Sequence, residues 1–287
     1  MNKNINEFLN CIDIIYWINL ERSLNRRNEM TKLLSTINIP NQRIDAVDGK
    51  DISDENLYKN FNNIQKHRSK VEYACLLSHL NSIKTFYDSS HNIALILEDD
   101  ISTEYLQYWN KTVCQIISEA PQDWEIIMLN YVSKTTLNDT YTLNKFGHIN
   151  CCQSYLINKK GAQKLIDSIY KNNIYELDSK KLHTSDNYIY STLVTYTYKY
   201  PYFTYPNNND STIHESHLDF HNWTKQNAFV AWKELYNFDS NKKEQFNNLN
   251  NSNNLINYNN KYIMNIFFII VIIILLGYLI KLYHSVV

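Results

Sequence analysis

Residues 94–100 read Ala-Leu-Ile-Leu-Glu-Asp-Asp, an apolar run that ends in three consecutive carboxylates. The apolar half predicts a buried strand, and burying a carboxylate without a partner would be prohibitively costly. Glu98, Asp99 and Asp100 are therefore expected at the exposed end of the strand, where a cation could relieve their mutual repulsion. Strand alternation would place Glu98 and Asp100 on one face and Asp99 on the other, so that one pair could share a magnesium or manganese ion. An acidic turn without a metal is the alternative, and the strand-end carboxylates of nucleases and phosphatases would look similar.

Strands and helices alternate along the chain around this run. The pattern of apolar residues predicts strands at 12–20, 43–47, 93–97 and 125–129. It predicts helices at 23–37, with Ser23 as its cap, and at 72–87 and 104–118. The alternation indicates an α/β fold, with a mostly parallel sheet flanked by helices. Ligands of such sheets bind beyond the carboxyl ends of the strands, which is where the three carboxylates are expected.

Charge and cysteine content narrow the range of partners. The chain has 28 Lys and Arg against 29 Asp and Glu, a net charge of -1, so nothing in its charge favours nucleic acid as a partner. Its five cysteines include no CxxC pair. Four of them lie in apolar runs, which indicates buried thiols in a domain exposed to the cytosol.

The two ends of the chain differ in character. Residues 1–10 are polar and do not resemble a signal peptide, whereas residues 262–282 include eighteen almost wholly apolar positions and predict a single-pass C-terminal transmembrane helix. A buried core helix is the alternative. Residues 237–261 are rich in Asn and predict a tether, residues 283–287 form a short tail, and residues 1–236 form the folded domain. This arrangement predicts a membrane protein whose domain remains on the cytosolic side.

Four sequence blocks together resemble glycosyltransferase family 25, the lipopolysaccharide biosynthesis and procollagen galactosyltransferase type. They are residues 15–27, 45–49, 72–79 and 95–100, and a fainter likeness continues through 123–129, 154–162 and Asp186. The resemblance covers about residues 14–213 and implies an A-type nucleotide-sugar transferase fold for the catalytic domain 1–236. It also implies an inverting enzyme that moves galactose from UDP onto a hydroxyl acceptor. One position departs from the family pattern, because Val71 stands where the family usually has Gly.

The same resemblance implies residues for binding the nucleotide sugar. Arg22 and Arg26 open the first predicted helix and could pair with phosphate, although solvated helix charges would look the same. Asp48 and Gly49 form a turn expected to border the nucleotide, or merely a tight turn. The remaining substrate-binding candidates are Glu72, Ser78, His79 and Glu98. A helical His is often structural, and a Glu at a helix start can simply favour the helix dipole.

Catalysis by such an enzyme needs a base and a metal. Inversion requires a group that removes the proton of the acceptor hydroxyl, and the candidate is Asp186, which could instead cap a helix. Asp99 is the second predicted catalytic residue. The predicted ligands of Mn²⁺ or Mg²⁺ are Asp100, Glu98 and the late His214, chosen over His217 and His221.

The implied partners are a UDP-sugar donor, a glycan, glycolipid or protein acceptor, and the membrane, with no nucleic acid. Two other functions stay open from the sequence. One is a catalytically inactive, membrane-tethered module that binds glycans or nucleotide sugars, and the other is a metal-dependent phosphoesterase that uses the same acidic strand end.

Overall fold

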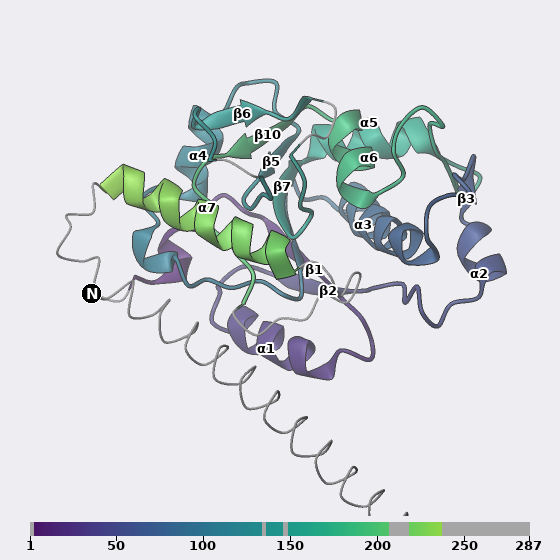
Figure 1. Ribbon diagram of the computed structural model, residues 1–287, viewed down its shortest axis with the longest axis horizontal. Coiled ribbons are helices and arrows are strands. Elements are labelled where there is room, and N and C mark those ends of the chain that lie inside the picture. Colours follow the sequence, from purple (N-terminus) through teal and green to yellow (C-terminus); the bar gives the residue numbers. More distant parts are fainter. Residues whose placement is uncertain (1–2, 134–135, 146–148, 207–217, 237–287) are drawn as a thin grey trace, which may run out of the picture. The chain divides into compact units, whose positions relative to one another are not determined.

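A seven-stranded sheet forms the centre of the computed structural model, in the order β2-β1-β4-β7-β5-β10-β6 (Figure 1). Strands β1, β2, β4, β5 and β10 run in one direction, while β6 and β7 run against it. The predicted α/β fold with a mostly parallel sheet is thus confirmed. The strands of this sheet are β1 (Ile14–Asn19), β2 (Asn41–Asp45), β4 (Ile93–Glu98), β5 (Ile126–Met128), β6 (Tyr141–Leu143), β7 (Ser154–Asn158) and β10 (Thr195–Tyr198).

The structure describes residues 3–133, 136–145, 149–206 and 218–236. Among these residues, no helix is long and apolar enough to cross a membrane. The predicted tether at 237–261, membrane helix at 262–282, tail at 283–287 and metal ligand His214 all lie outside the described residues. Apart from the end of α7, every element named here belongs to one compact unit, Met1–Trp232.

Helix α3 (Lys70–Asp88) packs along one face of the sheet, beside α5 (Lys159–Ile169) and α6 (Ser185–Thr192) (Figure 1). Its N-terminus is fixed by a capping box between Ser69 and Glu72. The predicted apolar stripe of α3 is confirmed, because Leu76, Leu80 and Ile83 are fully buried. Burying each such side chain contributes about 1.5–3 kcal/mol to stability.

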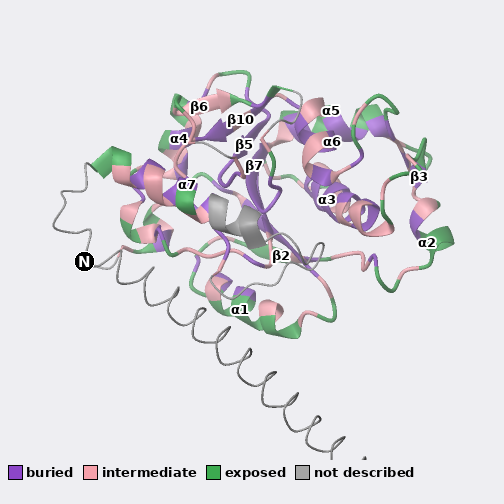
Figure 2. Ribbon diagram, in the orientation of Figure 1, coloured by how far each residue is buried: buried purple, intermediate pink, exposed green. Residues whose placement is uncertain are grey.

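Strand β1 is buried on both faces, which explains its unbroken apolar sequence. Tyr16 and Ile18 belong to the core cluster under α3, whereas Ile15 and Trp17 are buried on the opposite face. Figure 2 shows the central strands as almost continuously buried. A sheet buried in this way exposes polar groups mainly at its strand ends.

The remaining elements are two longer helices, α1 and α7, and several short segments. A second sheet has the order β3-β9-β8; β3 follows α2 in the chain, whereas β8 and β9 follow α5. These elements are η1 (Ile5–Glu7), α1 (Leu24–Leu34), α2 (Asp54–Tyr58), β3 (Phe61–Asn62), η2 (Leu106–Tyr108), α4 (Val113–Glu119), β8 (Tyr170–Lys171), β9 (Ile174–Glu176) and α7 (Leu218–Tyr236).

Two predicted helices differ from those observed. Helix α1 begins after Ser23 as expected, but the Ser23 side chain makes no capping hydrogen bond. The single helix predicted at 104–118 is wrong, since the chain forms η2 and then a separate α4. Thr112 and Gln115 build a capping box that starts α4 afresh, and Trp109 leaves the helical path to stack on Tyr202 with ring centroids 4.1 Å apart.

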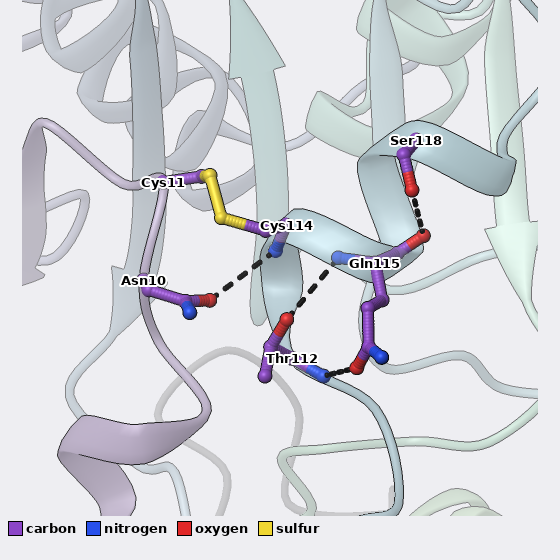
Figure 3. Close-up of a disulfide and its surroundings, with 6 residues drawn as sticks. All are labelled: Asn10, Cys11, Thr112, Cys114, Gln115 and Ser118. Carbon is purple, nitrogen blue, oxygen red and sulfur yellow. Dashed lines mark hydrogen bonds between the residues drawn. A yellow bond between two sulfur atoms is a disulfide. The ribbon is translucent and has the colours of Figure 1, made fainter.

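The prediction of buried thiols is wrong for Cys11 and Cys114, which form a disulfide (Figure 3). It joins the segment before β1 to the start of α4, where the Cys114 amide also donates to Asn10 Oδ1 at 3.4 Å. Cys151 and Cys152 are buried free thiols, as predicted, and Cys75 is a half-buried one. Since structural disulfides persist mainly in oxidising compartments, the cysteines no longer favour a cytosolic domain.

Candidate functional site

A pocket of about 600 Å³, including its open mouth, lies at the carboxyl ends of β1, β2 and β4. These three parallel strands end at one edge of the sheet, and the first turns of α1 and the N-terminal half of α3 form the other walls. A pocket therefore lies where the sequence predicts a ligand site, beyond the carboxyl ends of the strands. Nine of the predicted site residues line it: Arg22, Arg26, Asp48, Gly49, Ser78, His79, Glu98, Asp99 and Asp100.

Asp99 and Asp100 share one guanidinium in this pocket. Arg26 Nη1 lies 3.0 Å from Asp99 Oδ1 and 3.4 Å from Asp100 Oδ2. The prediction that alternation separates the two carboxylates is wrong, because β4 ends at Glu98 and the chain turns at the two aspartates. Gln153 Nε2 holds the turn by donating to the Asp100 carbonyl at 2.8 Å.

Burial dominates the electrostatics of this turn. It raises the pKa of Asp100 to about 7, with the Glu98 charge adding to the effect and Arg26 opposing it. Burial also raises the pKa of Asp99, against the stabilising contacts of Arg26 and Asn19. One guanidinium therefore only partly compensates the negative charge of three carboxylates.

Asn19, at the end of β1, is a site residue that the sequence analysis missed. Its amide nitrogen donates to Asp99 Oδ2 at 2.6 Å. Its amide oxygen accepts from Arg27 Nε at 3.1 Å and from Arg43 Nε at 3.0 Å, so the two arginines fix which way the amide points. The only signal in the sequence was a polar residue inside an apolar strand, and the side chain is 1% exposed.

His79 forms the buried floor of the pocket. Its Nε2 lies 3.1 Å from Glu98 Oε1, and its Nδ1 lies 3.2 Å from the Tyr155 hydroxyl. Burial alone would lower the pKa of His79, but the neighbouring Cys75 and Glu98 raise it to about 10. The Glu98 carboxylate thus favours the charged form of His79, against the effect of burial.

Cys75 completes a group of ligating atoms around His79. In the described part of the chain, the only three ligating side chains whose atoms all lie within 4.8 Å of one another are Cys75, His79 and Glu98. Glu98, Asp99 and Asp100 do not form such a set.

The turn after β2 packs directly against α3. A Cβ on Gly49 would lie 2.6 Å from Val71 Cα, so this close approach requires glycine. Ser78 Oγ accepts from the Val47 amide at 2.9 Å and donates to the Ala74 carbonyl at 2.7 Å. Ser78 thus fixes the turn to the helix and leaves little of its hydrogen-bonding capacity for a ligand.

Arg22 and Asp48 form an ion pair at the mouth of the pocket. Burial alone would raise the pKa of Asp48, but the Arg22 contact and the Lys50 amide, which donates at 2.9 Å, lower it instead. The pair holds the Arg22 guanidinium beside the pocket rather than in bulk solvent.

The model of glycosyltransferase family 25, described as a lipopolysaccharide biosynthesis protein, matches residues 12–180, more than half of the chain. The chain belongs to this family. It is similar to a glycosyltransferase 25 family member of Drosophila melanogaster, with 29% identity over 171 residues that cover 54% of this chain and 28% of that protein. It is also similar to procollagen galactosyltransferase 2 of mouse and of human, each with 28% identity over 174 residues that cover 54% of this chain and 27% of those proteins. The match thus spans less than a third of the length of these relatives.

Two predicted residues of this family 25 chain do not line the pocket. Glu72 is used in the capping box of α3 and pairs with Arg68 at 3.0 Å, as the simpler interpretation expected. Asp186 lies in the first turn of α6, where it accepts from the Thr184 hydroxyl and from the Asn187 amide at 2.8 Å each. It also lies beyond the family match, which ends at residue 180.

Proposed function

We propose that this family 25 chain is an active glycosyltransferase that moves a sugar from a UDP-sugar to a hydroxyl acceptor, with inversion. Galactose is the first sugar to test, because two of the similar proteins are named procollagen galactosyltransferases. The observation that carries the proposal is the pocket at the carboxyl edge of β1, β2 and β4, which combines two arginines with four carboxylates. The proposed acceptor is a hydroxyl group of a glycan, a glycolipid or a protein.

The arginines supply the contacts that a nucleotide diphosphate needs. Arg22 stands at the mouth with 41% of its side chain exposed, and Arg26 lies deeper with 16% exposed. A guanidinium offers paired donors that match phosphate oxygens. We assign Arg22 and Arg26 to the pyrophosphate, with Asp48 and Gly49 bordering the nucleoside and His79 holding Glu98 in place.

The carboxylates of the pocket are donors of the type that a hard divalent cation takes, although in this structure they do not converge on one point. Glu98 and Asp100 offer carboxylate oxygens, the ligand type that Mn²⁺ and Mg²⁺ prefer. Burial raises the pKa of Asp100 to about 7, the Glu98 charge adds to this effect, and a bound cation would lower the pKa again. We propose that Glu98 and Asp100 hold Mn²⁺ or Mg²⁺, with His214 as a further ligand. The cation would neutralise the charge that develops on the leaving diphosphate.

Transfer requires one proton to move. The acceptor oxygen forms a bond to the anomeric carbon, the bond from that carbon to the diphosphate oxygen breaks, and the diphosphate leaves with the electron pair. A carboxylate takes the hydroxyl proton. We propose Asp186 as this base; it does not line the pocket itself, but its neighbour Ser185 contacts the pocket residue Cys75 at 3.4 Å. We assign to Asp99, fixed by Arg26 and Asn19, the orientation of the donor.

A membrane anchor at 262–282 is part of the proposal. The cytosolic position of the domain stays a prediction, and the Cys11–Cys114 disulfide is an observation against it. Expression in eukaryotic cells tests on which side of the membrane the domain lies. Asn110 and Asn138 stand in Asn-x-Thr sequons, which acquire glycans only if the domain is in the lumen.

The experiment that tests the activity is a transfer assay on the full chain with UDP-galactose and a panel of sugar, glycolipid and peptide acceptors, with and without manganese. We expect manganese-dependent release of UDP, lost in Asp100→Asn and retained in Glu72→Gln, whose carboxylate lies outside the pocket lining. Folded protein that neither binds nor turns over any UDP-sugar in the presence of manganese would contradict the proposal.

One observation favours the alternative of an inactive binding module. Arg26 already contacts both Asp99 and Asp100, as a cation would in an active site. Calorimetric binding of UDP-galactose without turnover across the acceptor panel would favour this function over the enzyme.

A further inference from the structure

We propose that Cys75, His79 and Glu98 form a second metal site in the pocket, one that takes a thiophilic divalent cation such as Zn²⁺. The site differs from the hard-cation site proposed above in two of its three ligands. It shares Glu98 with that site, but it requires neither a nucleotide nor Asp100.

The ligand atoms are close to the spacing that zinc requires. Tetrahedral bonds of about 2.0–2.3 Å place ligand atoms about 3.3–3.8 Å apart. His79 Nε2 and Glu98 Oε1 are 3.1 Å apart, and all three ligating atoms lie within 4.8 Å of one another. Small side-chain rotations therefore suffice to close the site.

The backbone presents the ligands from rigid elements. Cys75 and His79 are one turn apart on α3, so their side chains project from the same face of that helix. Glu98 is the last residue of β4, which pairs with β1 and β7 on either side. A site built on a buried helix and a central strand is held more precisely than one built on loops.

A neighbouring hydroxyl orients the histidine for metal binding. The Tyr155 hydroxyl lies 3.2 Å from His79 Nδ1, which directs Nε2 toward Cys75 and Glu98. Zinc-bound histidines characteristically use their second nitrogen in this way. Cys75 Sγ is steadied by Ser185 Oγ at 3.4 Å.

Ligand chemistry separates this site from the carboxylate turn. A thiolate and an imidazole select zinc over manganese and magnesium, whereas carboxylates alone favour the harder ions. Because zinc binds the thiolate form of Cys75, metal binding would release a proton from this side chain. All three ligands line the pocket, which leaves a fourth position open to water or to an oxygen atom of a pocket ligand.

Cobalt provides the direct test, because Co²⁺ bound by a thiolate in a tetrahedral site gives charge-transfer and visible absorption. We expect the full chain, reduced mildly enough to keep Cys11–Cys114, to bind one equivalent of Co²⁺ with this signature, and zinc to displace it. Cys75→Ser should abolish the charge-transfer band. The matched control Cys151→Ser should retain it, since Cys151 contacts Tyr205 and is not in the ligand set.

A second measurement needs no variant. Zinc at about 100 times its dissociation constant should slow alkylation of Cys75 by iodoacetamide about 100-fold, because the free site is then about 1% populated. Magnesium at the same concentration should leave the rate unchanged. Peptide mass spectrometry separates Cys75 from the other thiols.

The outcomes distinguish this proposal from the proposed function. Asp99→Asn should keep the cobalt absorption while impairing nucleotide-sugar turnover. Absence of thiolate absorption in the unmodified chain, or unchanged Cys75 alkylation in zinc, would overturn the metal site and leave the transferase proposal intact. Cobalt absorption without any UDP-sugar binding would support the site and contradict the transferase.

Discussion

Of two buried histidines, His79 lies in α3 and His183 packs against it, and their surroundings shift their pKa values in opposite directions. His79 faces the Glu98 carboxylate and Cys75, and its pKa is raised to about 10 although burial alone would lower it. His183 is fully buried, meets the Tyr73 hydroxyl at 2.7 Å and the Asp178 carbonyl at 3.0 Å, and burial lowers its pKa. Neutral partners can satisfy a buried imidazole, but only a nearby negative charge keeps it charged. The first arrangement is typical of a functional site and the second of a structural one.

The same contrast holds between the pocket and the rest of the core. In the pocket, charged groups from distant parts of the chain contact one another and compensate each other only partly. Around His183 and at the Cys11–Cys114 disulfide, the contacts are neutral or covalent. We therefore expect pocket substitutions to affect function most, and substitutions at the second group to affect only stability.

The disulfide should give the largest effect on stability. It closes a loop of 103 residues, and the double substitution Cys11→Ser and Cys114→Ser should lower the free energy of unfolding by up to about 4.7 kcal/mol, the entropic limit for a loop near 100 residues. Denaturant unfolding with and without reductant measures it. UDP-sugar binding to the folded double variant should be unchanged. Loss of binding would show that the disulfide affects the pocket as well as stability.

Arg26→Ala should give the largest loss of function. Removing the guanidinium leaves two buried carboxylates without their cationic partner, and loss of one charge-stabilising group in an active site costs about 10²–10³ in turnover. Steady-state kinetics with UDP-galactose measures the effect, and Arg26→Lys, which keeps the charge but not the fork, should recover part of it. Turnover that is unchanged in Arg26→Ala would remove this residue from the site.

Asn19→Ala tests a positioning role within the pocket. The substitution removes the donor to Asp99 and the acceptor for Arg27 and Arg43, so it should destabilise the fold by about 1–3 kcal/mol. Turnover should fall about tenfold, through Asp99 losing its fixed orientation. Asn19→Gln serves as the comparison, since it keeps both functional groups one methylene away. A loss of stability with full turnover would make Asn19 purely structural.

His183 should give the smallest effect, visible only as a pH dependence. Its pKa is lowered by burial in the folded state, so below about pH 6.5 the unfolded chain binds a proton that the folded chain does not. This residue therefore makes stability fall as pH decreases below that point, by at most about 1.4 kcal/mol per pH unit. Unfolding curves from pH 7 to 5 for the unmodified chain and His183→Gln measure it, and equal slopes would contradict the assignment.

Local sequence patterns predicted the parts of this structure that depend on near neighbours. The apolar run at 93–97 and the carboxylates after it placed both a central strand and the pocket edge, because a buried strand can end in charge only at the edge of a sheet. The buried stripe of α3 was predictable because apolar residues three and four positions apart lie on one face of a helix.

Features made by distant contacts were not predictable in this way. The Cys11–Cys114 bond depends on two segments meeting in space, and the break between η2 and α4 depends on where Trp109 packs. The roles of Asn19 and Cys75 depend on partners that the local sequence does not reveal. Asn19 contacts Asp99, which is 80 residues away, and Cys75 lies near Glu98 of a different element. Alternation failed at Asp99 and Asp100 because the strand had already ended.

The central claim is that the pocket after β4 binds a nucleotide sugar together with a divalent cation. Isothermal titration calorimetry of UDP-galactose into the full chain tests it most directly, in manganese and in chelator. We predict one binding site in manganese, strong weakening in chelator and in Asp100→Asn, and unchanged binding in Glu72→Gln. Folded protein that shows no heat of binding in manganese, or equal binding by the unmodified chain and Asp100→Asn, would contradict it.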